Sequence, residues 1–459
     1  MYLSAGMTGL LVGLFLLMQG MLSRALDLDL SSREDVCHFT NEIQKGIMDY
    51  YWGSKYGGIV GMFQPPYYWW EAGEVFGGML ENWYLCDNQE YESVLRESMI
   101  AQTGDKFDYI PANQSTTEGN DDQGVWALFI MGAVERNFKD PEKEGMPGWL
   151  TMVQTVFNKM EARWDAENCG GGLRWQIFQW NNGYTYKNTI ANGCLFQLAA
   201  RLGRYTGNQT YLDVASKVFQ WLVDVKYIVL EDKARVFDGA HIHENCSDIK
   251  GIEWSYNHGI ILAGAAYMYN ATGGSPEWES HVTKILAGAA DFYFRDKIMY
   301  ERACQDYNTC DNDQRSFKSI FSRMLAITSV VAPFTRGTID ELIYASATAA
   351  SKSCEQGTHG YTCGLNWHKG TYDGVYGLGE QASALEIIQN VLIHTKAPPL
   401  TADTGGQSEG NPDAGLDHDS QPAILRGMHN ITGKDRVGAS LITAISLGLM
   451  LGCALWMIF

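Results

Sequence analysis

Two adjacent aspartates, Asp121 and Asp122, are the side chains of this sequence best placed to do chemistry. Glycosidic cleavage uses two carboxyl groups, one protonating the leaving oxygen and the other attacking the sugar or activating water. Neighbouring Cβ atoms on a helix lie roughly 5–6 Å apart, close to the carboxyl separation of about 5–5.5 Å in retaining glycosidases. Two carboxylates this close repel, which raises one pKa and prepares that group as the acid.

The same pair has a purely structural interpretation. An N-cap followed by an acidic residue in the first turn is favoured by the helix dipole. Other carboxyl groups also compete for a catalytic role, namely Glu71, Glu253 and Asp373. Two adjacent aspartates are therefore, taken alone, a weak signal.

The aspartate pair belongs to a series of similar helix openings. Apolar, small-residue-rich helices begin with polar and aromatic clusters, and successive clusters are 50 to 69 residues apart, the length of two helices and two loops. The residues that mark the six clusters are Glu71, Asp121, Asn188, Asn257, Phe317 and Glu380. Examples of paired helices are Cys194–Tyr205 with Tyr211–Val223, and Ile260–Tyr269 with Trp278–Phe294. The spacing predicts an all-α domain of six helical hairpins.

A ring explains the two kinds of helix. An inner helix contacts neighbours all round and must be apolar and slim, whereas an outer helix stays amphipathic. Six hairpins closed into a ring gather their inner-helix openings at one mouth, which predicts a cleft lined by polar and aromatic residues. The alternative is that each cluster is only an N-cap. A cap accounts for one polar residue per helix but not for the repeated Trp and Tyr.

Composition narrows the class of protein. The chain has 459 residues, 46% of them hydrophobic, and a formal net charge of −19. It lacks the basic cluster that a nucleic-acid-binding face requires. No CxxC motif accompanies HxxxH, so a structural zinc site is not expected.

Both ends of the sequence indicate export. Leu10–Leu22 is apolar and precedes Ser23-Arg24-Ala25, which predicts a signal peptide over residues 1–25, the alternative being an uncleaved anchor. Residues 398–436 predict a flexible stalk after a domain at 26–397. The uncharged segment 437–459 predicts a GPI-attachment tail, with a plain transmembrane anchor as the alternative. Candidate acceptor residues are Gly427, Asn430 and Gly433.

Export predicts glycosylation and disulfides. The five Asn-x-Ser/Thr sites are Asn113, Asn208, Asn245, Asn270 and Asn430. Removal of the tail leaves nine cysteines, most of which we expect to be paired, with one left over. Cys304–Cys310 and Cys354–Cys363 are close enough in sequence to be natural pairs.

The segment Thr117–Gly124 (TEGNDDQG) resembles the signature of glycoside hydrolase family 76, whose members include bacterial endo-α-1,6-mannanases and fungal GPI-anchored cell-wall proteins. Four further motifs resemble the fungal branch, and the likeness covers essentially the whole chain. They are Gly171–Gln176 (GGLRWQ), Tyr186–Cys194 (YKNTIANGC), Trp254–Gly259 (WSYNHG) and Trp367–Asp373 (WHKGTYD).

The resemblance implies an (α/α)6 barrel and a retaining mechanism without metal or cofactor. By position in the motif, Asp121 is the nucleophile and Asp122 the acid/base. The other motif residues resemble sugar contacts, with core packing or helix capping as their alternatives. Candidates for stacking on pyranose rings are Trp70, Trp175, Tyr186, Trp254 and Trp367. Candidates for polar contacts are Glu71, Arg174, Asn188, Asn192 and Asn257.

The expected activity is that of a mannan endo-1,6-α-mannosidase on α-mannan or a GPI glycan. A glycosyl-enzyme is open to interception by another sugar, so a transglycosylase that uses wall glucan as acceptor is the alternative. A third class is a non-catalytic glycan-binding wall protein, and a fourth an enzyme acting on another α-linked sugar. The resemblance implies a monomer held at the outer face of the plasma membrane by a lipid anchor.

Overall fold

The computed structural model describes residues 28–416, 443 and 446. Contacts divide the chain into two units, Met1–Gly415 and Leu416–Phe459. The predicted signal peptide, the glycosylation site Asn430 and almost all of the predicted hydrophobic tail lie outside the described residues. The fold described below is that of the first unit.

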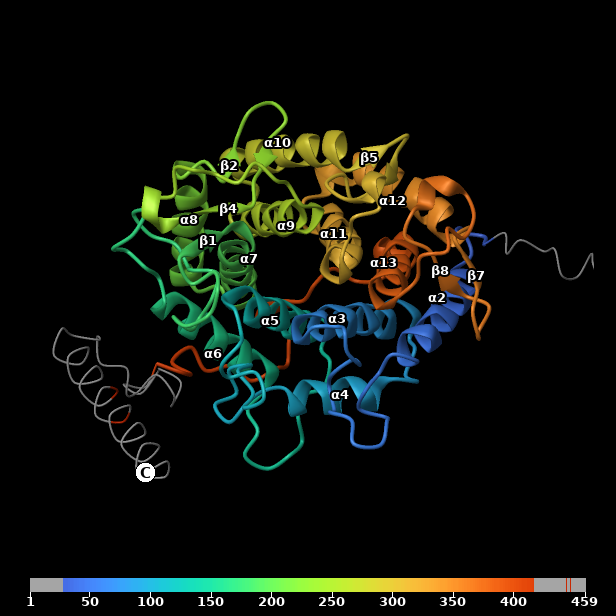
Figure 1. The fold of residues 1–459 in the computed structure, drawn as a ribbon, viewed down its shortest axis with the longest axis horizontal. Helices are drawn as coiled ribbons and strands as arrows, with labels where there is room; N and C mark the ends of the chain where they lie inside the picture. Colours follow the sequence, from blue (N-terminus) through green and yellow to red (C-terminus); the bar gives the residue numbers. More distant parts are fainter. Residues whose placement is uncertain (1–27, 417–442, 444–445, 447–459) are drawn as a thin grey trace, which may run out of the picture. The chain divides into compact units, whose positions relative to one another are not determined.

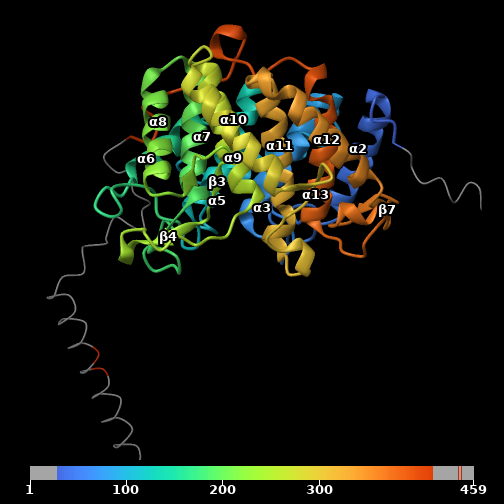
Figure 2. The same cartoon turned by 90° about the horizontal axis from the view of Figure 1, so that it is seen from above.

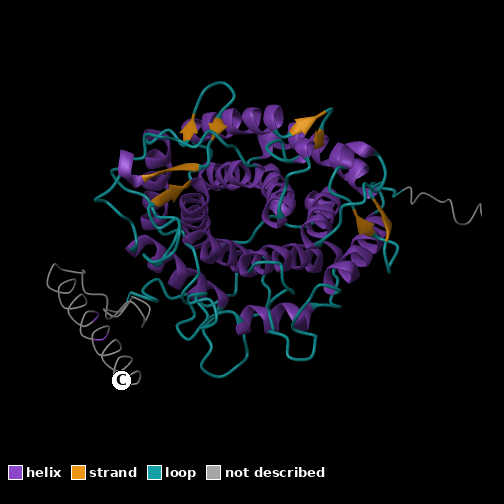
Figure 3. Ribbon diagram, viewed as in Figure 1, coloured by secondary structure: helices purple, strands orange, loops and turns teal. Residues whose placement is uncertain are grey.

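Six helices form a closed inner ring in the described part of this unit (Figures 1 and 3). Each packs on the next in chain order, and the last packs on the first. They are α3 (Trp69–Cys86), α5 (Asn120–Glu135), α7 (Thr189–Thr206), α9 (Ser255–Ala271), α11 (Asn312–Val331) and α13 (Leu378–Gln389). Each of the six predicted cluster residues lies in the first turns of one of them, or at its N-cap.

A second layer of six helices surrounds this ring within residues 28–416 (Figure 3). They are α2 (Arg33–Met48), α4 (Glu92–Ala101), α6 (Trp149–Ala162), α8 (Gln209–Asp224), α10 (Pro276–Phe292) and α12 (Arg336–Ser351). Figure 2 shows helices of both layers running side by side. The prediction of an all-α (α/α)6 barrel is confirmed.

Four short two-stranded antiparallel sheets lie among the connecting loops of the described chain. They pair β1 (Tyr186–Asn188) with β4 (Gly239–His241), β2 (Ile228–Val229) with β3 (Arg235–Val236), β5 (Phe294–Arg295) with β6 (Ile298–Met299), and β7 (Cys354–Gln356) with β8 (Thr362–Cys363). The β1–β4 ladder has the register Lys187↔Ala240 and leads directly into α7.

Glycines allow the inner helices to approach one another. A Cβ atom added to Gly124 on α5 would lie 2.5 Å from the Cβ of Cys194 on α7. One added to Gly264 on α9 would lie 2.5 Å from the ring of Phe196. Since real Cβ atoms do not approach this closely, larger residues at these positions would force the ring apart.

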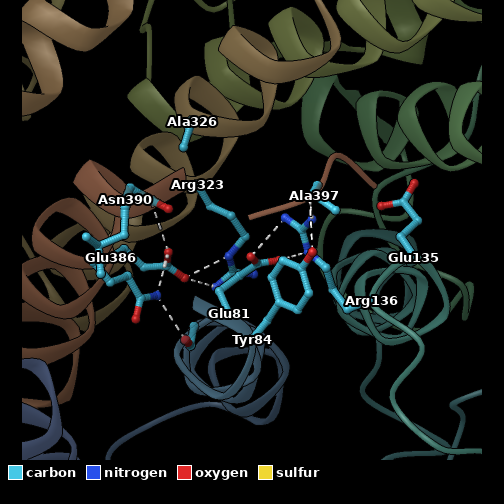
Figure 4. A network of polar contacts seen from close by, with 12 residues as sticks. Glu81, Tyr84, Glu135, Arg136, Arg323, Ala326, Glu386, Asn390 and Ala397 are labelled. Atoms are coloured by element: carbon cyan, nitrogen blue, oxygen red, sulfur yellow. Dashed lines mark hydrogen bonds and ion pairs between the residues drawn. The ribbon is translucent and has the colours of Figure 1, made fainter. Parts of the chain in front are cut away.

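The C-terminal ends of the inner helices meet at the second mouth of the barrel, which carries buried ion pairs (Figure 4). Arg136 contacts Glu81 at 3.1 Å, and Arg201 contacts Glu135 at 2.7 Å. Arg323 Nε donates to Glu386 Oε1 at 2.7 Å. Each of these side chains has a partner of opposite charge in hydrogen-bonding contact, which offsets the cost of burying it.

The chain after residue 397 folds onto this end of the barrel, which corrects the predicted stalk for residues 398–415. Leu400 N donates to Glu135 O at 3.0 Å, and Asn158 Nδ2 donates to Pro412 O at 2.8 Å. Few of these contacts use an apolar side chain, which is why composition did not reveal them. The remainder of the predicted stalk lies almost wholly outside the described residues.

The described cysteines form four disulfides, Cys37–Cys86, Cys169–Cys246, Cys304–Cys310 and Cys354–Cys363. Both predicted short-range pairs are confirmed, as is a single free cysteine in this part of the chain, the buried Cys194. Among the residues described, no single helix has the length and apolar composition to cross a bilayer, and one bent pair, Asn312–Val331 with Pro333–Ser351, passes by length and composition alone.

The four described glycosylation candidates lie on the surface. Asn208 caps α8, and Asn113 and Asn245 are in loops. Asn270 differs from these because both ends of its amide are engaged. Its Nδ2 donates to Val331 O at 2.9 Å, and its Oδ1 accepts from Arg204 Nε at 2.7 Å. A glycan on Asn270 would replace one of the two hydrogens of Nδ2, the atom that donates to Val331 O.

Candidate active site

A pocket of about 470 Å³ opens at the mouth where the inner helices begin. Five of the six inner helices contribute a residue from their first turns or the residue just before them, as the ring predicts. The lining residues are Tyr68, Trp69, Trp70, Gln114, Thr117, Glu118, Asp121, Asp122, Val125, Trp175, Gln176, Ile190, Tyr256, Asp313 and Phe317. Four of the sequence-predicted site residues are among them: Asp121, Asp122, Trp70 and Trp175.

The aspartate pair lies in the first turn of α5. Gly119 is the N-cap residue, and its N–H donates to Asp122 Oδ2 at 2.6 Å. The N–H of Asp122 donates to Asp121 Oδ1 at 3.1 Å. Both carboxyl groups thus accept backbone hydrogen bonds from the helix opening and still border the pocket. The N-cap is Gly119 rather than an aspartate, and the pair occupies the first turn, where the helix dipole favours acidic residues.

Burial changes the acidity of the pair. Loss of solvent raises the pKa of Asp122 to about 6, against the opposing effect of the Gly119 hydrogen bond. Burial and then the neighbouring charge of Asp122 raise the pKa of Asp121 well above its usual value. Two such carboxyls share a proton near neutral pH, so one acid and one base are available together.

The segment that carries Trp175 is held beside the aspartates by backbone pairing. Gly119 and Gln176 form an antiparallel bridge. Asn120 N donates to Trp175 O at 2.8 Å, and Asn120 Nδ2 donates to Arg174 O at 2.9 Å. Backbone hydrogen bonds and one isolated bridge therefore join the TEGNDDQG and GGLRWQ motifs and hold the partly exposed Trp175 indole at the pocket wall.

Helices α3, α9 and α11 build another part of the pocket wall. Tyr256 and Phe317 stack with ring centroids 3.9 Å apart. Trp70 Nε1 donates to Asp313 Oδ1 at 3.1 Å. This wall combines aromatic surface with one carboxylate, a pattern suited to a sugar, which has apolar C–H faces and hydroxyl edges.

Four predicted contacts lie outside the pocket lining, in structural roles. Arg174 forms an ion pair with Asp165 at 2.8 Å. Tyr186 is buried and donates from its hydroxyl to Asp238 at 2.6 Å. Asn188 is the N-cap of α7, the alternative given for it above. Asn192 is buried, where it accepts from Leu173 N at 2.7 Å and donates back to Leu173 O at 3.1 Å.

The other four predicted contacts also lie behind the lining. Glu71 is buried and accepts the N–H of Tyr68 at 2.6 Å, and burial raises its pKa to about 9. Trp254 is the N-cap residue of α9, and Trp367 is buried with Lys318 Nζ 3.8 Å from its ring centroid. Asn257 is fully buried, and neither polar atom of its side chain has a hydrogen-bond partner among the described residues.

Sequence reasoning missed two acidic residues of the pocket. Glu118 is buried, and neither carboxylate oxygen has a hydrogen-bond partner in the described chain. Asp313 lies in the first turn of α11. Glu118 falls inside the TEGNDDQG motif and Asp313 just before the cluster at Phe317, so position within a helix-opening cluster was the available signal. Among the described residues, no group of three or more His, Cys, Asp or Glu is arranged to hold a metal ion.

Comparison with known proteins adds to this geometry. Residues 35–403 match the family model Glycosyl hydrolase family 76. The chain is 62% identical over 437 residues, 95% of each chain, to mannan endo-1,6-alpha-mannosidase DFG5 of Saccharomyces cerevisiae. It is 50% identical over 441 residues, 95% of this chain and 96% of the relative, to the protein of the same name from Candida albicans.

A solved structure is similar in sequence and in fold. The crystal structure of Dfg5 from Chaetomium thermophilum in complex with glucosamine is 37% identical, with a TM-score of 0.81. The match covers 86% of this chain and 98% of that one. Family model, relatives and barrel agree over nearly the full folded unit, and the chain belongs to glycosyl hydrolase family 76.

Proposed function

We propose that this chain is a mannan endo-1,6-α-mannosidase that cleaves α-1,6-mannosidic linkages with retention, using Asp121 and Asp122 as its two carboxyl groups. The observation that carries the proposal is the location of this pair. The two adjacent carboxyls lie side by side at the pocket formed by the inner-helix openings, with both pKa values raised by burial. The names of the relatives supply the substrate class.

In this mechanism one aspartate attacks the anomeric carbon while the other protonates the departing oxygen, and the second then activates water to release the glycosyl-enzyme. Family resemblance assigns attack to Asp121 and proton transfer to Asp122. The Gly119 hydrogen bond supports the reverse order, since it favours ionised Asp122. Trp70 and Trp175 provide the aromatic surface of the sugar site.

An activated 2-fluoro-mannoside tests the pair and the order together. The fluorine slows breakdown of the glycosyl-enzyme, so the labelled peptide identifies the nucleophile by mass spectrometry. We expect one label per chain, within the peptide that contains Asp121 and Asp122, and no label in the Asp121→Ala protein. Mannoside binding without labelling would support the non-catalytic alternative instead.

Transfer to a second sugar is a second candidate for the same site. The observation that favours it is glucosamine in the crystal structure of a 37% identical relative, because that sugar is not mannose. Incubation with an α-1,6-mannan oligomer, with and without a glucan acceptor, separates the outcomes. New reducing ends indicate hydrolysis, and chimeric oligosaccharides indicate transfer.

The proposed setting is the outer face of the plasma membrane and the cell wall, reached by secretion and held by a GPI anchor. Four disulfides among the described residues support passage through an oxidising compartment. Release of the protein from membranes by a phosphatidylinositol-specific phospholipase tests the anchor. A plain transmembrane segment would resist that treatment.

A further inference from the structure

Asp313 is a pocket carboxylate that the mechanism above does not use. Its helix, α11, is three positions round the inner ring from α5, which carries Asp121 and Asp122. Asp313 and the aspartate pair therefore border one pocket from opposite sides of the ring. A sugar seated against the pair would present its far edge to Asp313.

The local helix does not need this carboxylate. The N-cap of α11 is Asp311, whose Oδ1 accepts the N–H of Gln314 at 3.1 Å in a complete capping box. The carboxylate of Asp313 makes one hydrogen bond to the described chain, from Trp70 Nε1 to Oδ1. An ionised carboxylate has about four lone-pair positions, so most of its accepting capacity, including that of Oδ2, is open.

The charge of Asp313 also lacks a protein partner. No Lys, Arg or His occurs among the described residues that line the pocket, which carry three further carboxyls, Glu118, Asp121 and Asp122. A ligand that fills the pocket removes water from Asp313 and must replace the lost hydrogen bonds. Hydroxyl groups of a glycan are donors that do so without bringing a charge.

We propose that Asp313 is a substrate-binding residue whose free oxygen accepts hydrogen bonds from hydroxyls of the sugar unit held against Asp121 and Asp122. The hydrogen bond from Trp70 orients the Asp313 carboxylate, so that the indole and the carboxylate together form one face of the sugar site. The inference deepens the proposed function and rests on it. It adds a specificity determinant from α11 to a site whose reacting groups come from α5.

The test measures binding apart from catalysis. The parent is the full chain carrying Asp121→Asn and Asp122→Asn, and the probe is α-1,6-mannotetraose titrated by calorimetry. We expect Asp313→Ala to weaken the affinity of this parent about 10- to 100-fold, the range for loss of hydrogen bonds to a charged group. Asp313→Asn keeps an acceptor for Trp70, and its affinity for mannotetraose should lie between those of the parent and of Asp313→Ala.

Asp311→Asn is the matched control, because it makes the same chemical change on the same turn of α11 and Asn is also a good N-cap. Asp311 does not line the pocket, and we expect its variant to bind as the parent does. A melting temperature close to the parent's shows that each variant is folded. Should Asp313→Ala fail to fold, Asp313→Asn carries the comparison.

Asp313→Asn separates direct binding from an effect through the indole, because it keeps an acceptor for Trp70 Nε1 and removes the carboxylate. If Asp313→Asn binds as tightly as the parent while Asp313→Ala binds more weakly, Asp313 acts only by orienting Trp70 and the proposal is overturned. Unchanged affinity in Asp313→Ala overturns it as well, while leaving the proposed function intact. A parent that binds no mannotetraose overturns the proposed function and, with it, this inference.

Discussion

The backbone N–H of Gly119 donates a 2.6 Å hydrogen bond to Oδ2 of Asp122, so a carboxyl group that borders the pocket also caps the helix that carries it. Helix capping holds the side chain in one rotamer and favours its ionised form, whereas burial favours the neutral form. The opening of α5 therefore sets both the position and the acidity of the group.

Substitution of either aspartate should abolish turnover. Asp121→Asn and Asp122→Asn each retain size and accepting ability but lose the negative charge and the exchangeable acid. We expect kcat on α-1,6-mannan oligomers to fall by at least about 10³-fold in each variant, since nucleophile and acid act as a unit. Reducing-end release measures the rate. Glu90→Gln, a change on an exposed loop, is the control and should leave kcat unaltered.

The plot of rate against pH should be bell-shaped, and its acidic limb should lie at a higher pH than that of an exposed carboxyl group. Turnover needs one carboxyl ionised and the other protonated, and the pair titrates together. The first ionisation is expected near pH 6, the raised value at Asp122, because burial disfavours charge there. The profile of kcat/KM against pH should therefore fall on the acidic side near pH 6. An acidic limb near 4, as for an exposed carboxyl, would contradict the desolvated pocket.

The free energy of unfolding should respond to pH through the buried carboxyl of Glu74. Burial raises its pKa to about 8 although Ser319 donates a hydrogen bond to it. The folded state thus binds more protons than the unfolded state between about pH 4.5 and 8, and stability falls as pH rises through this window. Glu74→Gln removes the titration.

We expect Glu74→Gln to gain stability relative to the parent as pH is raised from 5 to 8, measured by denaturant unfolding at each pH. Glu90→Gln, at an exposed position, serves as the control and should show no such trend. A constant difference between Glu74→Gln and the parent at every pH would mean that Glu74 is already ionised in the folded protein at pH 5.

Removing one partner of a buried ion pair at the second mouth should destabilise the protein more than removing both partners. Arg201→Met leaves Glu135 buried beside the hydroxyl of Tyr267, 2.9 Å away, without its cation. The expected loss in unfolding free energy is about 3–5 kcal/mol. The double variant Arg201→Met with Glu135→Leu removes both charges and should recover much of that loss. Additive losses in the double variant would show that the two residues do not depend on each other.

C-terminal truncation should show whether residues 398–415 stabilise the barrel or form a stalk that does not contribute to its stability. A chain that ends at Gly415 keeps the hydrogen bonds from residues 399–414, such as Leu400 N to Glu135 O and Asn158 Nδ2 to Pro412 O. A chain that ends at residue 397 loses them. We expect the longer chain to melt as the full protein does and the shorter one roughly 5 °C lower or more. Equal melting temperatures would restore the stalk boundary at 398.

The sequence by itself determined the features that depend on neighbours along the chain. Helix openings recur at Glu71, Asp121 and Asn188 because one hairpin spans a set length, and small residues mark the inner helices because only slim helices pack all round. Short loops brought Cys304 close to Cys310 in the same way. These periodic signals sufficed for the all-α barrel and for the aspartate pair at its mouth.

Only the tertiary structure decided which motif residues border the pocket. Arg174, Asn188 and Asn192 lie in matching motifs yet bind Asp165 or backbone groups, while Glu118 and Asp313 complete the lining. The side a residue presents to a ring depends on how neighbouring helices and loops cover it, and sequence spacing does not contain that information. The segment after residue 397 is a second example. It is held to the barrel by hydrogen bonds to residues far away in the sequence, and amino-acid composition does not reveal such contacts.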